Sequence, residues 1–134
     1  PFKFYLAVTV ATAMTNDRIE SLFFLKSQAV VAIIFMHGYL QVELTNATLT
    51  CYPGPLVLGT ASDYTINHPD YKNQLCQLIN QSVKELTEID KGLVVTFTEH
   101  ELLFEPDGSR EILVVTDGNG EWYSYPDITL SGTD

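Results

Sequence analysis

The sequence predicts an α+β domain with a mainly antiparallel sheet, two short helices and an added N-terminal strand. Three observations indicate this class: a length of 134 residues, apolar residues that alternate along short segments, and an internal repeat. A chain of this length is one ordinary domain, and it can bury about two thirds of the surface that its unfolded form exposes. We therefore expect a single domain over residues 1–134.

An internal duplication is the strongest of these signals. Residues 22–53 align with residues 75–106 without a gap, at a constant offset of 53. The identical pairs include Leu22/Leu75, Leu25/Leu78, Gln28/Gln81, Val30/Val83, Leu40/Leu93, Val42/Val95, Leu49/Leu102 and Pro53/Pro106. We expect two αβββ-like units, over about residues 20–60 and 70–117. One such unit has too little apolar area to be stable alone, but two units can share a core.

The first unit reads as a helix followed by three strands. Thr15 and Asn16 are candidate helix caps, and the apolar stripe that follows them contains Ile19, Leu22 and Phe23. Strands are expected over residues 29–35, 39–45 and 48–52. Turns are expected at His37-Gly38 and Asn46-Ala47, and Pro53-Gly54-Pro55 ends the last strand.

The second unit has the same order. Pro69 suits the first turn of a helix that runs to about Asn80. Strands are expected over residues 83–89, 93–97, 101–105, 112–116 and 121–125. Turns are expected at residues 90–92, 99–100, 106–108 and 117–120.

The N-terminal segment has two interpretations. Lys3, the apolar residues after it and Ala11-Thr12-Ala13 have the outline of a secretory signal. The apolar stretch is short, however, and its β-branched and aromatic residues suit a strand. We predict an N-terminal strand within Pro1–Thr15.

Composition excludes several functional classes. Apolar residues make up 46% and charged residues 18% of the chain, which excludes disorder. The net charge of −10 argues against nucleic acid and anionic membranes as partners, because both would repel the protein. No apolar run is long enough to cross a bilayer. Cys51 and Cys76 form no metal or disulfide pattern, so we expect reduced thiols and a cytoplasmic protein.

The acidic residues are concentrated in the second half of the chain. The net charge is −1 over residues 1–67 and −9 over residues 68–134. A partner that binds through electrostatics is therefore expected to be a basic protein that meets the second half. The alternative interpretation is an acidic face that only keeps the protein soluble.

The second half combines Leu75 and Leu78 of the expected helix with the strand pattern Leu93-Val95-Phe97 and three later elements. In this order they resemble a family of small, duplicated, acidic bacterial proteins of unknown function. The resemblance covers about residues 20–126 and is carried by the leucines of the second helix, by the strand pattern that follows and by three later elements. These later elements are Leu102-Phe104, Pro106-Asp107-Gly108 and the aromatic cluster Trp122-Tyr123-Tyr125. Such families resemble the immunity proteins that neutralise bacterial toxins, so the resemblance implies an inhibitor-like binding protein without catalytic residues.

Candidate chemistry is sparse. A free N-terminal proline is the general base of the tautomerase superfamily, which makes Pro1 a candidate catalytic residue. His37, His68 and His100 share no ligand spacing, and residues 117–121 resemble a calcium loop but fit a hairpin turn better. We expect no cofactor and no metal site.

Two groups of residues are candidates for partner binding. The first is a set of carboxylates around one predicted hairpin: Glu99, Glu101, Glu105 and Asp107. The second is the terminal aromatic cluster: Trp122, Tyr123 and Tyr125. Tryptophan and tyrosine are common interface residues, although core packing of a terminal strand explains them equally well.

The sequence therefore favours a binding protein that is not an enzyme and that engages a basic protein. A proton-transfer enzyme that depends on Pro1 is an alternative, and a homodimer or larger homo-oligomer held by sheet edges is another.

Overall fold

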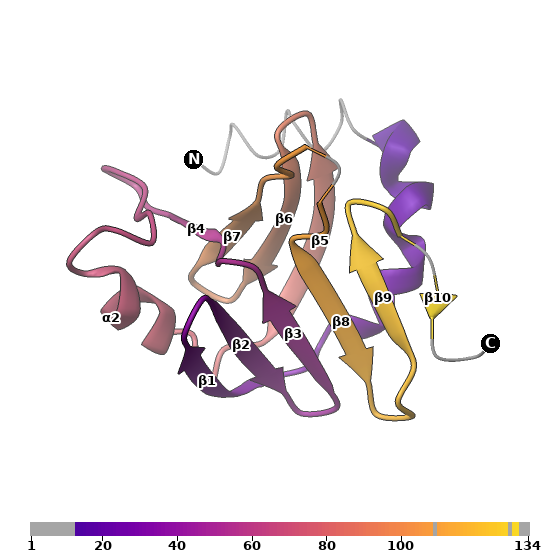
Figure 1. Ribbon diagram of the computed structural model, residues 1–134, viewed down its shortest axis with the longest axis horizontal. Coiled ribbons are helices and arrows are strands. Elements are labelled where there is room, and N and C mark those ends of the chain that lie inside the picture. The colour runs from indigo at the N-terminus through magenta and orange to yellow at the C-terminus, as the bar shows by residue number, and fades with distance from the viewer. Residues whose placement is uncertain (1–12, 109, 129, 132–134) are drawn as a thin grey trace.

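Ten strands in the described part of the chain form two antiparallel sheets (Figure 1). The structure is a computed structural model that describes residues 13–108, 110–128 and 130–131. The six-stranded sheet has the order β1(Val30–Met36), β2(Tyr39–Leu44), β3(Ala47–Cys51), β8(Leu113–Asp117), β9(Trp122–Tyr125), β10(Leu130–Ser131). The four-stranded sheet has the order β4(Leu56–Leu58), β7(Glu101–Phe104), β6(Gly92–Phe97), β5(Val83–Ile89). The helices are a 3-10 helix, η1(Ala13–Leu25), and α2(Tyr71–Cys76). The predicted, mainly antiparallel architecture with few helices is confirmed.

The chain passes between the two sheets twice. After β3 it leaves the six-stranded sheet, and β4 pairs with β7 at the edge of the four-stranded sheet. After β7 it returns, and β8 pairs with β3. At the second crossing the N–H of Tyr52 donates to the carbonyl of Ile112 at 2.9 Å, and the N–H of Ile112 donates to the carbonyl of Tyr125 at 2.9 Å. Strand β4 therefore joins the four-stranded sheet directly after the β2–β3 hairpin, and β8 joins the six-stranded sheet directly after the β6–β7 hairpin.

The core lies between the two sheets, which Figure 1 shows one in front of the other. Strand β2 illustrates the pattern, because Leu40, Val42 and Leu44 are buried while the residues between them are partly exposed. This is the alternation that the sequence predicts. The second sheet contributes a matching apolar face, and the largest fully buried side chains are Ile19, Leu22, Leu25, Leu49, Leu75, Leu78, Leu86, Leu93, Phe97, Leu102, Phe104 and Tyr125.

Backbone contacts recur at an offset of 53 residues. The pairs Val30–Leu44 and Val83–Phe97 occupy the same register, and the same irregularity follows each of them. The N–H of Val30 donates to the carbonyl of Gln81 at 2.8 Å, and the N–H of Val83 donates to the carbonyl of Gln28 at 2.9 Å. These two reciprocal bonds join the start of β1 to the start of β5.

The structure also departs from the predicted elements. The second helix is only Tyr71–Cys76, shorter than the predicted Pro69–Asn80. The helix stops because Leu78 and Ile79 donate to carbonyls three residues back, and Asn80 has a φ of 78°, outside the helical region. Strands β4 and β10 were not predicted. Of the N-terminal segment, residues 13–15 belong to η1, and the predicted strand otherwise lies outside the described residues.

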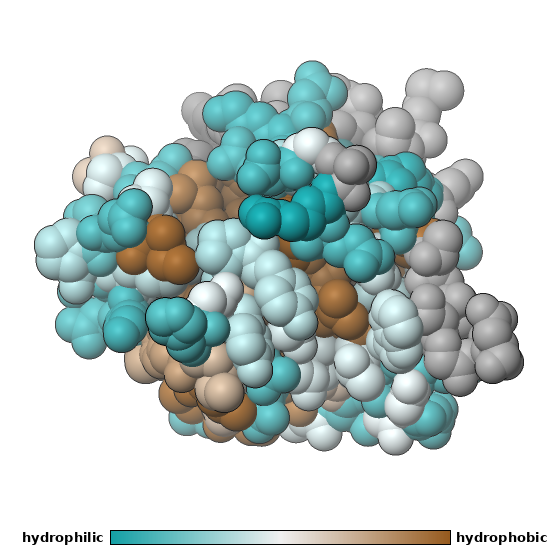
Figure 2. Space-filling model, viewed as in Figure 1, coloured by the Kyte–Doolittle hydropathy of each residue, from teal (hydrophilic) through white to brown (hydrophobic). Residues whose placement is uncertain are grey.

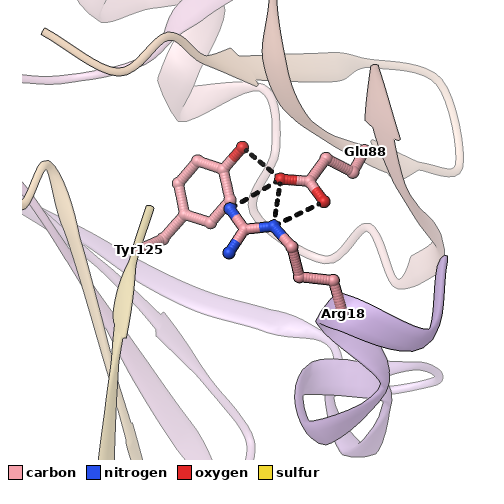
Figure 3. A network of polar contacts seen from close by, with 3 residues as sticks. All are labelled: Arg18, Glu88 and Tyr125. Atoms are coloured by element: carbon pink, nitrogen blue, oxygen red, sulfur yellow. Dashed lines mark hydrogen bonds and ion pairs between the residues drawn. The ribbon is translucent and has the colours of Figure 1, made fainter. Parts of the chain in front are cut away.

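One polar network ties η1 to both sheets (Figure 3). Arg18 of η1 forms an ion pair with Glu88 of β5, with a distance of 2.8 Å between Nη2 and Oε2. The hydroxyl of Tyr125, at the end of β9, donates to the same carboxylate at 3.0 Å. The Arg18 guanidinium also lies 5.6 Å from the centre of the Tyr125 ring. The hydrogen bond to Glu88 raises the pKa of Arg18.

Tyr125→Phe is expected to lower the free energy of unfolding by about 1–2 kcal/mol, because it removes a hydrogen bond to a charged acceptor and leaves the ring in place. Urea unfolding should show a lower midpoint with an unchanged slope. Tyr52→Phe is a matched control, since Tyr52 is 39% exposed. An equal loss in both variants would contradict a specific contribution from the Tyr125 hydroxyl.

A second buried phenol predicts alkaline sensitivity. Tyr71 is buried, and its hydroxyl donates to the carbonyl of Pro55. Burial, with a smaller contribution from Cys51, raises the pKa of Tyr71 above its ordinary value of 10.0. A phenol whose pKa is raised by folding contributes stability below the unfolded pKa, and this stability is lost as the pH rises above it.

Tyr71→Phe should therefore make alkaline destabilisation shallower than in the wild type. The measurement is the free energy of unfolding at about pH 8 and about pH 10.5 in both proteins. If both proteins lose the same amount between these two pH values, burial of the Tyr71 phenol is not linked to stability.

Candidate functional site

The four predicted carboxylates divide into two pairs. Glu99 and Glu101 lie at the start of β7, where the N–H of Glu99 donates to the side chain of Gln81 at 2.8 Å. Glu105 and Asp107 follow the opposite end of β7 and are exposed. The strand between the pairs separates them by roughly 13 Å at the usual rise per residue. The four carboxylates therefore do not form one cluster.

Glu101 is more enclosed than its neighbours. Thr96 donates to its carboxylate at 3.4 Å from the adjacent strand β6. Burial raises the pKa of Glu101, and the hydrogen bond from Thr96 partly opposes this shift. The Glu101 side chain is therefore partly enclosed by its cross-strand neighbour Thr96 and is not fully open to a partner.

The aromatic cluster is likewise distributed over different environments. Trp122 is 38% exposed, whereas Tyr125 is 2% exposed. The Tyr125 hydroxyl bonds to Glu88, and its ring contacts the Arg18 guanidinium. Tyr123 packs against the core, and its ring centre lies 5.7 Å from that of Phe24. Trp122 is thus the most exposed member of this cluster.

Trp122 belongs to the outer face of the six-stranded sheet, most of whose side chains are partly exposed. We define this face by the side chains of β2, β3, β8 and β9 that alternate with the core residues: Tyr39, Gln41, Glu43, Thr48, Thr50, Val114, Thr116, Trp122 and Ser124. Thr50 and Ser124 are buried beneath their neighbours, so the other seven residues form the accessible part of the face. Glu43 is the one charged residue in this set. Figure 2 shows the area over β2 and β3 as pale, with strongly hydrophilic side chains above it. The face is therefore nearly uncharged on a protein of net charge −10.

A cleft of about 550 Å³ lies at one end of the outer face, where the chain crosses between the sheets. Its lining residues are Gly38, Tyr52, Pro53, Arg110, Glu111 and Val114. A smaller hollow of about 60 Å³ shares Tyr52, Pro53 and Arg110 with it and is bordered by Glu105 and Asp107. One pair of the predicted carboxylates therefore stands beside the cleft. The Tyr52 ring centre is 5.5 Å from that of Tyr39, so two aromatic rings meet at this end of the face.

The charges around the cleft are mostly negative and weakly paired. Arg110 and Asp107 are 3.4 Å apart and both exposed, so this ion pair contributes little stability. We call Glu105, Asp107 and Glu111 the acidic rim. With Arg110 the rim carries an excess of negative charge, which favours a cationic group. The sequence analysis missed Tyr39, Tyr52 and Arg110, although strand alternation could have placed Tyr39 on the outer face with Gln41.

The other candidate chemistry stays apart from this surface. Pro1 lies outside the described residues, so its catalytic role remains a prediction. In the described ranges no three His, Cys, Asp or Glu side chains are grouped closely enough to hold a metal ion. Asp117 instead accepts the N–H groups of Asn119 and Glu121 within the β8–β9 turn. None of the helices in the same ranges is long and apolar enough to cross a membrane.

Comparison of the chain with protein-family models, with curated proteins and with solved structures finds no match.

Trp122→Ala should change stability little, by less than about 1 kcal/mol, because a side chain that is 38% exposed makes few core contacts. Thermal unfolding of the wild type and of this variant measures the difference. Tyr125→Ala is the buried reference from the same strand and should lose about 3–5 kcal/mol. A comparable loss in Trp122→Ala would show that Trp122 serves core packing and not the outer surface.

Proposed function

We propose that the protein is a binding protein, not an enzyme, that engages a basic protein through the outer face and the acidic rim. The observation that carries this proposal is the nearly uncharged outer face on a chain of net charge −10. If solubility were the only requirement, an open sheet face would carry several charged side chains, but Glu43 is the one charged residue of this face.

The composition of the surface supports a protein partner. The cores of protein interfaces are depleted in charged residues and enriched in aromatic ones, and their rims are polar. The outer face supplies Trp122 and Tyr39, together with threonine and glutamine side chains between them, and the cleft at its end supplies Tyr52. The acidic rim at the cleft supplies the complementary charge for basic residues of the partner.

We also propose that the chain is a duplicated αβββ-like unit, over about residues 20–60 and 70–117. Matched registers in β1–β2 and β5–β6 support this, as do the reciprocal bonds of Val30 and Val83. A side-chain motif agrees with it, because Gln28 and Gln81 each donate to a carbonyl four residues back and accept an N–H eighteen residues ahead.

The two free cysteines, Cys51 and Cys76, support a cytoplasmic setting.

Affinity capture from the source cells tests the binding function. The wild-type protein should retain at least one basic protein at low ionic strength and release it as salt is added, because salt screens the charges of the rim. Thr48→Arg places a positive charge in the outer face and should abolish retention. Glu111→Lys reverses one charge of the rim and should weaken it.

Thr60→Arg is the matched control, since Thr60 is exposed in the segment after β4 and away from the outer face. It should retain the same protein as the wild type. Retention that is insensitive to salt, or that survives Thr48→Arg, would overturn the proposed function. Retention of no basic protein at all would overturn it as well.

A further inference from the structure

Strand β1 forms one edge of the six-stranded sheet and carries no charged or polar side chain. Its seven residues are Val30, Val31, Ala32, Ile33, Ile34, Phe35 and Met36. In the described part of the chain, β1 pairs along its length with β2 alone. Figure 2 shows hydrophobic side chains gathered at the corner of the molecule where Figure 1 places β1. Long apolar edge strands are pairing sites, and most proteins protect them with charge or cover.

The backbone of β1 has hydrogen-bonding groups that face away from β2. Val30 shows their direction, because its N–H donates to Gln81 and its carbonyl accepts from Asn80 at 2.9 Å. The two-residue turn that closes the β1–β2 hairpin makes Met36 and Tyr39 a hydrogen-bonded pair. Residues of the opposite parity, Ile33 and Phe35, therefore turn their N–H and carbonyl groups to the outer edge.

Strand β5 occupies the same register 53 residues later and provides an internal comparison. At the positions of Val31, Ala32 and Phe35 it carries Lys84, Glu85 and Glu88. Helix η1 lies against β5, and its Arg18 forms an ion pair with Glu88. Lys26, the residue after η1, forms an ion pair with Glu85. The edge of β5 is therefore charged and covered by its own chain.

Strand β1 has a smaller cover in the described residues. Its nearest helix, α2, has six residues, and its contact with β1 includes Lys72 over the Phe35 ring at 5.3 Å. Val31 is 52% and Met36 is 49% exposed, which makes them two of the most exposed large apolar side chains. The outer edge of β1 is therefore less covered than that of β5, and beyond Val30 it carries exposed apolar side chains at Val31 and Met36.

We propose that β1 pairs with β1 of a second copy of this chain, antiparallel across a twofold axis. A second copy suits this edge because the strand is complementary to itself when it pairs antiparallel across a twofold axis. Two molecules of net charge −10 repel each other least where they meet through an uncharged surface, and β1 is uncharged over its whole length. With Ile33 and Phe35 as the bonding residues, the two copies of Ile34 lie opposite each other. The pairing is isologous and closed, so it produces a dimer and not a filament.

Analytical ultracentrifugation over a concentration series tests the proposal. The wild type should sediment as a dimer that dissociates on dilution. Ile34→Lys brings two positive charges together at the axis and should raise the dissociation constant at least about tenfold. Val31→Lys, which copies Lys84 of β5, should act in the same direction. Circular dichroism of each variant checks that the fold is retained.

Ile66→Lys is the matched control, because Ile66 is 48% exposed and lies in the segment between β4 and α2. It should leave the dimer unchanged. A wild type that stays monomeric at high concentration would overturn the proposal, as would a dimer that both β1 variants leave intact. These outcomes do not depend on the basic partner, since Thr48→Arg alters the outer face two strands away from the β1 edge.

Discussion

The structure depends on one constraint, namely that neither sheet can bury its apolar face without the other. Strand β4 pairs with β7 in the four-stranded sheet and β8 pairs with β3 in the six-stranded sheet, and the chain reaches each of these strands directly from the opposite sheet. The halves are therefore linked by backbone pairing as well as by apolar contact. Arg18, Glu88 and Tyr125 add a polar link at the point where η1, β5 and β9 meet. Because these contacts join distant parts of the chain, unfolding of one sheet should expose the core of both.

The crossings that satisfy this constraint also create the cleft. Where the chain leaves β3, Tyr52 bonds to Ile112 and the path turns through Pro53 and Gly54. Close packing fixes Gly54, since a Cβ there would lie 2.7 Å from the hydroxyl of Tyr71. This path carries the Tyr52 ring to the outer surface beside Arg110 and Glu111. The cleft of the candidate binding surface is thus formed by the segments in which the chain crosses from one sheet to the other.

Local patterns predicted most of the strands but not their long-range partners. The alternation of Leu40, Val42 and Leu44 and the turn at His37-Gly38 identify β2 and its hairpin, because period-two burial and turn chemistry are local. Nothing local indicates that β8 pairs with β3 or that β4 pairs with β7. For the same reason the sequence placed Glu99 with Glu105, although β7 separates them. It also left Tyr125 open as a surface residue, because no local pattern indicates that its ring joins the core or that its hydroxyl bonds to Glu88 of the other sheet.

Strands β1 and β5 occupy matching positions but differ in charge, and this difference bears on function more than their shared register does. Strands β1 and β5 share a register, so the fold accepts either apolar or charged residues at the edge positions. Lys84, Glu85 and Glu88 satisfy the fold on one strand, and Val31, Ala32 and Phe35 satisfy it on the other. Folding alone therefore does not require an uncharged edge on β1. The same reasoning applies to the outer face, where threonine, tyrosine and tryptophan stand at positions that an acidic chain could fill with carboxylates. Residues that the fold does not demand, gathered on one side of the molecule, are best explained by contact with other molecules.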